Sequence, residues 1–145
     1  MNTLVIYDTN FGNTKIIAEA IAEGLGKGSK TINVTEASEK DLKGSDILIA
    51  GSPIIGWKPS ERMQGFLGKL AKGQLKGMKA ASFDTRAKIF HGDAAKKISQ
   101  ALKDSGAEII SEPSCFYVKG KEGPLFNGEK EKAVEWGKKL KELCG

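Results

Sequence analysis

Five short apolar runs rich in β-forming residues alternate with helical patterns along the whole chain, and this alternation is the feature that most limits the fold. The third run, residues 47–50, is apolar on both faces, as expected of a central parallel strand. Strand, helix and strand in this rhythm, joined by right-handed crossovers, predict a doubly wound parallel sheet of the α/β class. The predicted strands cover residues 3–7, 31–35, 47–50, 79–83 and 108–111, with an extension of the last over 115–118.

Apolar residues recur at helical spacing between these runs. The polar segment 36–45 is short, so its crossover holds at most about two turns of helix. With 145 residues and no linker or repeat, the chain is predicted to form a single domain, 1–145. The predicted helical stripes are Ile16, Ile17, Ala20, Ile21 and Leu25; Met63, Phe66, Leu67 and Leu70; Ile98 and Leu102; and Ala133, Trp136, Gly137, Leu140 and Cys144.

Composition narrows the class of protein. Hydrophobic residues make up 39% of the chain and charged residues 28%, which is ordinary for a globular domain. The apolar runs are far shorter than the roughly 20 residues that span a bilayer, and Met1 leads almost directly into a strand without a signal-peptide pattern. We therefore expect a cytoplasmic protein without membrane contact. The net charge is +5, but lysines alternate with acidic residues, so nucleic acid is not an expected partner.

Metal and thiol chemistry have little support in the sequence. Cys115 and Cys144 are the only cysteines and have no CxxC spacing, which favours buried or incidental thiols. His91 is the only histidine, and a lone histidine without a partner cluster does not make a metal site. We expect no bound metal.

The turn Thr9-Asn10-Phe11-Gly12-Asn13-Thr14 joins the apolar run 4–7 to a helical run that begins at Lys15. A turn that leaves a buried strand and enters a helix presents backbone N–H groups and the positive end of the helix dipole at one point. Thr9 and Thr14 add hydroxyl donors, and Gly12 allows close approach of the backbone. The turn contains no lysine or arginine, so it suits a tightly held phosphomonoester better than a nucleoside triphosphate.

Doubly wound sheets bind ligands at the carboxyl ends of their strands, and three predicted loops, 8–14, 51–60 and 84–93, meet at that edge. The first of them carries a family resemblance. Residues 5–14, Val-Ile-Tyr-Asp-Thr-Asn-Phe-Gly-Asn-Thr, followed by Ala18, resemble the phosphate-loop signature of flavodoxins, with Ala20 where a larger aliphatic residue is usual. The resemblance extends over the whole chain and is to short-chain flavodoxins. It implies the strand order 2-1-3-4-5, noncovalent binding of FMN, and contacts to its phosphate from Thr9, Asn10, Gly12, Asn13 and Thr14. Phe11 of the same turn is also a predicted cofactor-binding residue.

The resemblance also assigns the other two loops to the flavin ring. Trp57 would stack on the ring, although it could instead cover the top of the sheet, and Phe90 or His91 would flank the other side. Gly56 is the candidate for a peptide that reorients when a ring nitrogen gains a proton. The predicted cofactor-binding residues of these loops are Ser52, Pro53, Ile54, Ile55, Gly56 and Trp57, and Asp84, Thr85, Arg86, Phe90, His91 and Gly92.

Arg86 and Lys88 are unusual for a family that is acidic as a group. If both cations approach the ring, they stabilise the anionic reduced flavin and raise its potential. The alternative is that both side chains point into water. The positive net charge of the chain further suggests redox partner proteins with acidic docking surfaces.

Other functions that use this architecture are less well supported. A phosphorelay receiver needs a carboxylate at the end of the third strand, where Ala50-Gly51-Ser52-Pro53 stands, and a low-molecular-weight phosphatase needs a cysteine in the first loop. A corrinoid-binding domain needs a histidine near the first strand. We therefore predict an electron carrier rather than an enzyme, because the cofactor supplies the chemistry. The alternatives are an FMN-dependent oxidoreductase of quinone or protoporphyrinogen type and a scaffold without tight flavin binding; no second glycine-rich dinucleotide fingerprint supports the former.

Overall fold

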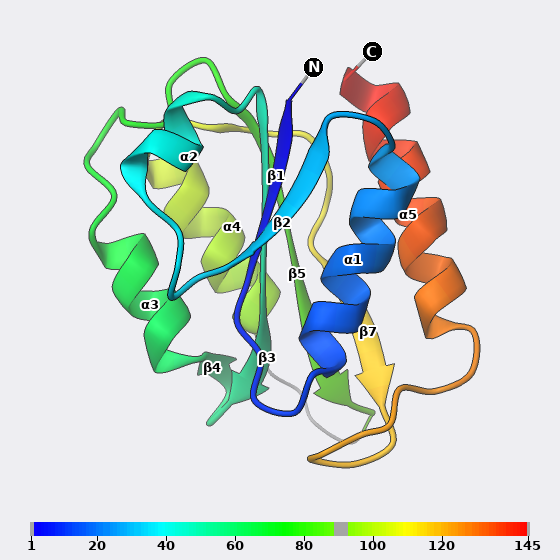
Figure 1. Cartoon of the computed structure of the whole chain (residues 1–145). Coiled ribbons are helices and arrows are strands. Elements are labelled where there is room, and N and C mark those ends of the chain that lie inside the picture. Colours follow the sequence, from blue (N-terminus) through cyan, green and yellow to red (C-terminus); the bar gives the residue numbers. More distant parts are fainter. Residues whose placement is uncertain (1, 89–92, 145) are drawn as a thin grey trace.

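The chain forms a sheet with helices on both of its faces (Figure 1). This computed structural model describes residues 2–88 and 93–144. Within them the sheet has the order β2-β1-β3-β5-β6, with β4 paired to β3 and β7 paired to β5. The strands are β1 (Thr3–Tyr7), β2 (Ser29–Asn33), β3 (Ile47–Ile55), β4 (Lys58–Pro59), β5 (Lys79–Ala87), β6 (Glu108–Ile109) and β7 (Ser114–Val118). The helices are α1 (Asn13–Leu25), α2 (Glu39–Lys43), α3 (Glu61–Gly68), α4 (Ala94–Asp104) and α5 (Glu129–Cys144).

The predicted doubly wound α/β sheet is confirmed. The strands β2, β1, β3 and β5 are parallel neighbours in that order, and both β6 and β7 pair in parallel with β5. Once the short hairpin strand β4 is left out and β6 and β7 are taken as one interrupted strand, this is the predicted order 2-1-3-4-5. The crossover between β2 and β3 holds one short helix, α2, as the polar segment there predicted.

The predictions for the third and fourth strands end too early. β3 continues to Ile55 and β5 to Ala87, so the segments 51–55 and 84–87, predicted as loop, are strand. The parallel ladder between β3 and β5 extends as far as Pro53 opposite Thr85. Beyond it β3 pairs with β4 in an antiparallel hairpin. The backbone groups of these segments therefore find partners in the sheet, which apolar patterning alone did not reveal.

The second and fifth predicted strands also need correction. β2 begins two residues earlier than predicted, because its partners run from Thr3 opposite Ser29 to Tyr7 opposite Asn33. The predicted fifth strand is divided into β6 and β7. Four residues, 110–113, connect β6 to β7, whereas only two residues of β5, 81–82, separate the two ladders, so the pairing is interrupted here. The segment ends in Pro113, which has no N–H to donate to a ladder.

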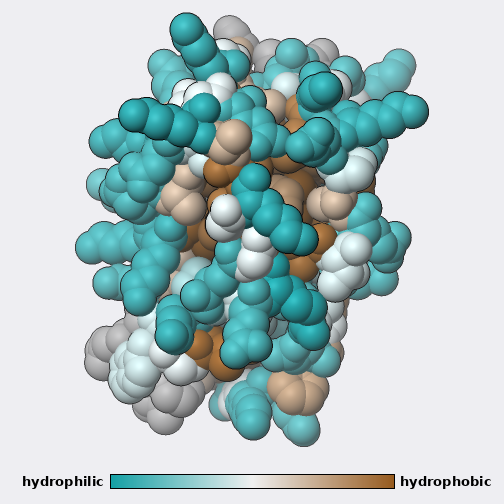
Figure 2. Space-filling model, turned by 90° about the vertical axis from the view of Figure 1, so that its left-hand side faces the viewer, coloured by the Kyte–Doolittle hydropathy of each residue, from teal (hydrophilic) through white to brown (hydrophobic). Residues whose placement is uncertain are grey.

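Each face of the sheet has its own apolar core, because successive side chains of a strand point to opposite faces. Val5 and Tyr7 of β1 belong to the core under α1 and α5, whereas Leu4 and Ile6 belong to the core under α2, α3 and α4. Figure 1 shows the two helical layers on either side of the strands. Figure 2 shows the α2, α3 and α4 side, where hydrophilic side chains cover most of the surface and apolar ones are visible between them.

The helix α5 packs closely on α1. A Cβ atom added at Gly137 would collide with the backbone oxygen of Ile21, and one at Gly24 with that of Val134, so both glycines permit the close contact. Trp136 was predicted to be in the core from its place in the apolar stripe of the last helix. It lies partly buried against Phe83, with ring centroids 6.3 Å apart in an edge-to-face arrangement.

Two residues depart from their predicted stripes. Ile16 is exposed on the outer side of α1, and Leu70 lies beyond the end of α3, although it still packs against the apolar core. No helix in the described part of the chain is long and apolar enough to cross a membrane.

Candidate functional site

A cleft of about 400 Å³ opens at the carboxyl ends of β1, β3 and β5. Its volume lies in the range of small-molecule and cofactor sites. Its lining comes from four segments: the turn after β1, the end of β3, the end of β5 and the stretch that follows β7. The lining residues are Thr9, Asn10, Phe11, Asn13, Thr14, Pro53, Ile54, Ile55, Gly56, Thr85, Arg86, Ala87, Val118, Gly120 and Lys121.

The turn after β1 is closed by its own hydrogen bonds. The backbone N–H of Gly12 donates to Thr9 Oγ1 at 2.9 Å, and Gly12 takes φ 93°, a left-handed conformation that glycine adopts without strain. Gly12 caps the amino end of α1, so the first N–H groups of that helix face the mouth of the turn. The turn thus has the geometry of an anion site at a helix N-terminus.

Thr14 connects this turn to β5. Its side chain is buried, and its hydroxyl oxygen lies 2.8 Å from that of Thr85. Each hydroxyl carries one hydrogen, and their mutual hydrogen bond uses only one of the two. The other hydrogen remains available to an acceptor in the cleft.

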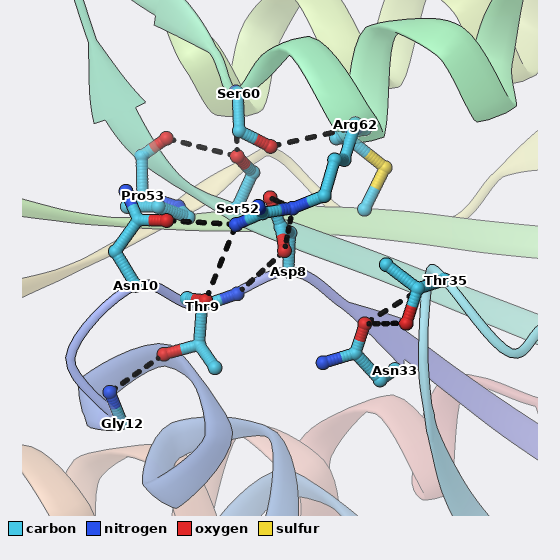
Figure 3. A network of polar contacts seen from close by, with 11 residues as sticks. Asp8, Thr9, Asn10, Gly12, Asn33, Thr35, Ser52, Pro53, Ser60 and Arg62 are labelled. Carbon is cyan, nitrogen blue, oxygen red and sulfur yellow. Dashed lines mark hydrogen bonds and ion pairs between the residues drawn. The ribbon is translucent and has the colours of Figure 1, made fainter.

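A cation from α3 lies behind the turn. Arg62 Nε donates to both carboxylate oxygens of Asp8, at 2.9 and 3.0 Å, and Arg62 Nη2 donates to Asn10 Oδ1 at 2.7 Å (Figure 3). Asp8 is only 1% exposed. The turn itself contains no basic residue, as the sequence indicated, yet the fold supplies one. Sequence reasoning missed Arg62 because it lies in a different helical segment with no motif to mark it.

The end of β3 and β4 form a tight hairpin that carries Gly56 and Trp57 between the paired residues Ile55 and Lys58. Both central residues have positive φ, 58° for Gly56 and 71° for Trp57, as a type I′ turn requires. A bulky residue with positive φ is uncommon and indicates local strain. Trp57 is 55% exposed and lies outside the cleft lining described above.

Ser52 supports this hairpin from inside. Its hydroxyl accepts a hydrogen bond from the Ser60 N–H at 2.9 Å and donates to the Pro53 carbonyl. The side chain is fully buried and outside the lining, so Ser52 shapes the wall through these two bonds.

The cation at Arg86 is neutralised by a neighbour. Arg86 Nε donates to Asp84 Oδ1 at 2.8 Å, and the fully buried Asp84 carboxylate also accepts the N–H of Ala95. The hydrogen bond to Asp84 raises the pKa of the Arg86 guanidinium above its ordinary value. The Arg86 side chain is 14% exposed, so it does not point into water. Its charge is largely compensated beside the cleft, which weakens the expectation that it raises a flavin potential.

Lys88 is exposed but lies against aromatic rings. Its ammonium lies 4.3 Å from the centroid of the Phe126 ring and 5.9 Å from that of Tyr117. Lys119 approaches the same Phe126 ring at 6.0 Å. These contacts are of the cation–π kind and hold two lysines on the β7 side of the molecule.

The fold brings most of the predicted site residues together. The predicted residues in the cleft lining are Thr9, Asn10, Phe11, Asn13, Thr14, Pro53, Ile54, Ile55, Gly56, Thr85 and Arg86. Gly12, Ser52, Trp57 and Asp84 lie beside the cleft in the same segments without lining it. Phe90, His91 and Gly92 lie outside the described residues.

Sequence reasoning missed the wall formed by Ala87, Val118, Gly120 and Lys121. Val118 of β7 pairs with Ala87 of β5, and this ladder carries the following residues to the cleft. Asn13 Nδ2 donates to the Glu122 carbonyl at 3.1 Å and ties this stretch to the start of α1. The sequence offered only a glycine- and lysine-rich turn here, a pattern that gives no signal for its tertiary position.

The lining combines two kinds of chemistry. Hydroxyl and amide donors gather at the turn after β1, whereas Ile54, Ile55 and Val118 contribute apolar surface. This division suits a flat aromatic ligand with a phosphate tail, since apolar walls bury a ring and neutral donors hold an anion. In the described residues no group of histidine, cysteine, aspartate and glutamate side chains could hold a metal ion.

Comparison with known proteins identifies relatives of this arrangement. A family model described as a flavodoxin domain matches residues 4–124. The flavodoxin of Aquifex aeolicus is 38% identical over 90 residues, which cover 57% of this chain and 48% of that protein. The flavodoxin of Maridesulfovibrio salexigens is 29% identical over 145 residues, which cover 93% of each.

The match to the Aquifex protein spans about half of that protein's length. A putative diflavin flavoprotein of Synechocystis is 32% identical over 113 residues, which cover 73% of this chain and only 19% of that protein. Among solved structures, a flavodoxin from the domain Archaea superposes with a TM-score of 0.86 at 20% identity and covers 100% of both chains. That superposition shows a shared fold.

Proposed function

The chain belongs to the flavodoxin family, and we propose that it binds FMN in the cleft and carries electrons between redox partner proteins in the cytoplasm. Flavodoxin-family proteins bind FMN as their cofactor. The observation that most supports the proposal is the position of the hydroxyl-rich turn, at the amino end of α1 and at one end of a cleft with apolar walls.

In this proposal the turn from Thr9 to Thr14 holds the phosphate through backbone N–H groups and the two threonine hydroxyls. Ile54, Ile55 and Val118 would bury the flavin ring, and Trp57 at the tip of the hairpin would cover its exposed edge. The bound flavin would supply the redox chemistry, and the chain would position it and set its electrostatic surroundings.

Titration of the apoprotein with FMN, riboflavin and FAD tests the cofactor assignment. We expect FMN to bind most tightly, because riboflavin lacks the phosphate and FAD adds a nucleotide for which the described lining of the cleft shows no second phosphate turn. Quenching of flavin fluorescence measures each dissociation constant. Failure to bind any flavin would exclude both the carrier and the FMN-dependent oxidoreductase and favour a scaffold.

A turnover assay separates a carrier from an enzyme. We expect the FMN-loaded protein, once photoreduced, to pass electrons to an acceptor but not to oxidise NADH or NADPH in the presence of a quinone. Sustained nicotinamide-dependent quinone reduction by the protein alone would contradict the carrier assignment.

We further propose that the partners present acidic surfaces. Lys88 and Lys119 lie over the same Phe126 ring, and Lys121 lines the cleft itself. The cations near the cleft would attract carboxylates of a partner and accelerate its approach.

Small charged acceptors test this charge distribution without a known partner. We expect the photoreduced protein to reduce anionic ferricyanide at a rate that falls with ionic strength, and cationic hexaammineruthenium at a rate that rises with it. Lys121→Gln should diminish both salt effects, whereas Lys72→Gln, at an exposed site beyond the far end of α3, should leave them unchanged. The opposite signs of salt dependence would contradict an acidic partner surface.

A further inference from the structure

The Asp8 carboxylate lies at the base of the phosphate turn, almost fully buried. A buried carboxylate is unfavourable unless hydrogen bonds or a cation compensate it. Here Arg62 Nε reaches both carboxylate oxygens, and the Thr9 N–H donates to Asp8 Oδ1 at 2.9 Å. The Thr9 N–H is a neutral donor, so Arg62 supplies the positive charge that compensates the buried Asp8 carboxylate.

Arg62 also contacts the two residues that follow Asp8. Its Nη2 group donates to Asn10 Oδ1 at 2.7 Å and approaches the Thr9 carbonyl at 3.4 Å. The next link is within the turn, where Thr9 Oγ1 accepts the Gly12 N–H. Figure 3 shows these contacts as one connected network that runs from the guanidinium to the amino end of α1.

The backbone around Arg62 is itself fixed. Ser60 caps α3 by accepting the Met63 N–H at 3.2 Å, and the Ser60 N–H donates to Ser52 Oγ in β3. Met63, the residue after Arg62, is fully buried. The guanidinium therefore extends from a rigid base in the first turn of α3, although half of the side chain is exposed.

We propose that Arg62, held by Asp8, is a positioning residue that keeps the turn shaped for a phosphate and so determines how strongly the chain prefers a phosphorylated flavin. The inference rests on the proposed function. The Asp8 carboxylate neutralises the Arg62 guanidinium and keeps it in contact with Thr9 and Asn10. Arg62 would therefore affect a bound phosphate by fixing the conformation of the turn. A turn ordered in advance loses less conformational freedom when its ligand binds.

This role differs from simple attraction between the arginine and a phosphate. If Arg62 acted by charge alone, removal of the Asp8 charge would free the guanidinium and tighten phosphate binding. If Arg62 acts through the turn, loss of either partner loosens the same network. Asp8→Asn and Arg62→Gln should then both weaken FMN binding, and the double variant should be little worse than Arg62→Gln alone.

The test compares dissociation constants of FMN and riboflavin for the wild type, Arg62→Gln, Arg62→Lys, Asp8→Asn and the double variant. We expect Arg62→Gln to reduce the preference for FMN over riboflavin by on the order of tenfold, as for the loss of charge-assisted hydrogen bonds. Arg62→Lys should restore only part of it, because lysine keeps the charge without the planar fork of donors. The loss should persist in 0.5 M potassium chloride. Salt at this concentration screens the attraction between exposed charges, whereas it screens hydrogen-bonded contacts to a buried carboxylate much less.

Lys69→Gln is the matched control, since it removes an exposed positive charge at the other end of α3. It should leave both dissociation constants unchanged. A second readout uses no flavin: inorganic phosphate should raise the thermal unfolding midpoint of the wild-type apoprotein more than that of Arg62→Gln, because a ligand that binds only the folded state stabilises it.

An unchanged FMN-to-riboflavin preference in Arg62→Gln, or tighter FMN binding by Asp8→Asn, would overturn the inference and leave the proposed function intact. Equal weakening of both flavins would also overturn it, because the defect would then lie outside phosphate recognition. A wild-type chain that binds neither flavin would instead contradict the proposed function, and the inference with it.

Discussion

The hydroxyl oxygens of Thr14 and Thr85 lie 2.8 Å apart in the interior of the molecule, although 71 positions separate the two residues in the sequence. Thr14 belongs to the first turn of α1 and Thr85 to the end of β5. Their contact joins the turn after β1 to the end of β5, and both segments line the cleft. The two regions that the sequence assigned to opposite ends of one ligand are thus held in fixed relation to each other.

Thr14→Val should weaken FMN binding by about 1–3 kcal/mol, because it removes a hydroxyl from the anion site and leaves the Thr85 hydroxyl without its buried partner. Fluorescence titration of the apoprotein measures the change. Thr31→Val in β2 is a matched control, since it makes the same substitution away from the cleft lining. An unchanged dissociation constant for Thr14→Val would contradict the assignment of the phosphate site.

Trp57→Asn should stabilise the apoprotein and weaken flavin binding. Asparagine tolerates the positive φ of 71° at this position better than tryptophan, and such strain is worth roughly 1–3 kcal/mol. The same change removes the indole proposed to cover the flavin. Urea unfolding and FMN titration measure the two effects separately. Lower stability together with unaltered FMN affinity would refute both parts of this prediction.

Gly137→Ala should destabilise the fold by about 1–3 kcal/mol, because its new Cβ atom would collide with the Ile21 backbone oxygen and push α5 away from α1. Gly65→Ala is the matched control. Gly65 lies within α3 with open space around it, so alanine there should raise stability by up to about 1 kcal/mol through helix propensity. Thermal or urea unfolding compares them. Equal effects of the two substitutions would show that helix contact does not limit position 137.

The stability of the chain should depend on the ionisation of Cys115 at alkaline pH. Burial, followed by the nearby Asp84 charge, raises the pKa of the Cys115 thiol from 9.0 to about 11. Between these values the unfolded chain has released a proton that the folded chain keeps, so the free energy of unfolding falls as pH rises from 9 to 11.

Cys115→Ser removes this titration while other groups continue to titrate. The wild type should therefore lose stability relative to Cys115→Ser across that window, by roughly 1 kcal/mol once solvent screening of this partly exposed thiol is included. Urea unfolding at pH 8, 9, 10 and 11 measures the difference. A constant difference between the two proteins over this range would contradict the raised pKa.

The sequence predicted the junction of strand, turn and helix around Thr9 to Thr14 because its signals are local, although α1 begins at Asn13 rather than at Lys15. A buried strand, a short glycine-containing turn and a helical stripe follow one another within a few residues, and the backbone geometry of such a junction depends little on the rest of the chain. The core of the central strand was equally predictable, since the apolar residues 47–50 are buried on both faces. The ends of β3 and β5 were not, because hydrogen bonds to neighbouring strands extend them beyond their apolar residues.

Charge was the least predictable property of the site. The sequence placed Arg86 in a loop, where it would either approach the flavin or point into water. In the structure it lies in β5 and is held against Asp84 two residues earlier, on the same side of the strand. Arg62 carried no local signal at all and contacts the turn after β1 only because α3 folds back over Asp8. Ion pairs depend on distances of a few ångströms between segments, which neither spacing nor composition encodes.

The sequence by itself determined the doubly wound sheet and the short glycine-containing turn between the first strand and the first helix, whereas the strand order came from the family resemblance. The sheet and the turn follow from periodic burial and from the chemistry of neighbouring residues, both of which are local. Only the tertiary structure decided which charges compensate one another, which stretch after β7 closes the cleft, and that Arg62 and Asp8 brace the turn. Those outcomes depend on long-range contacts, whose strength comes from the burial and geometry that the complete fold provides.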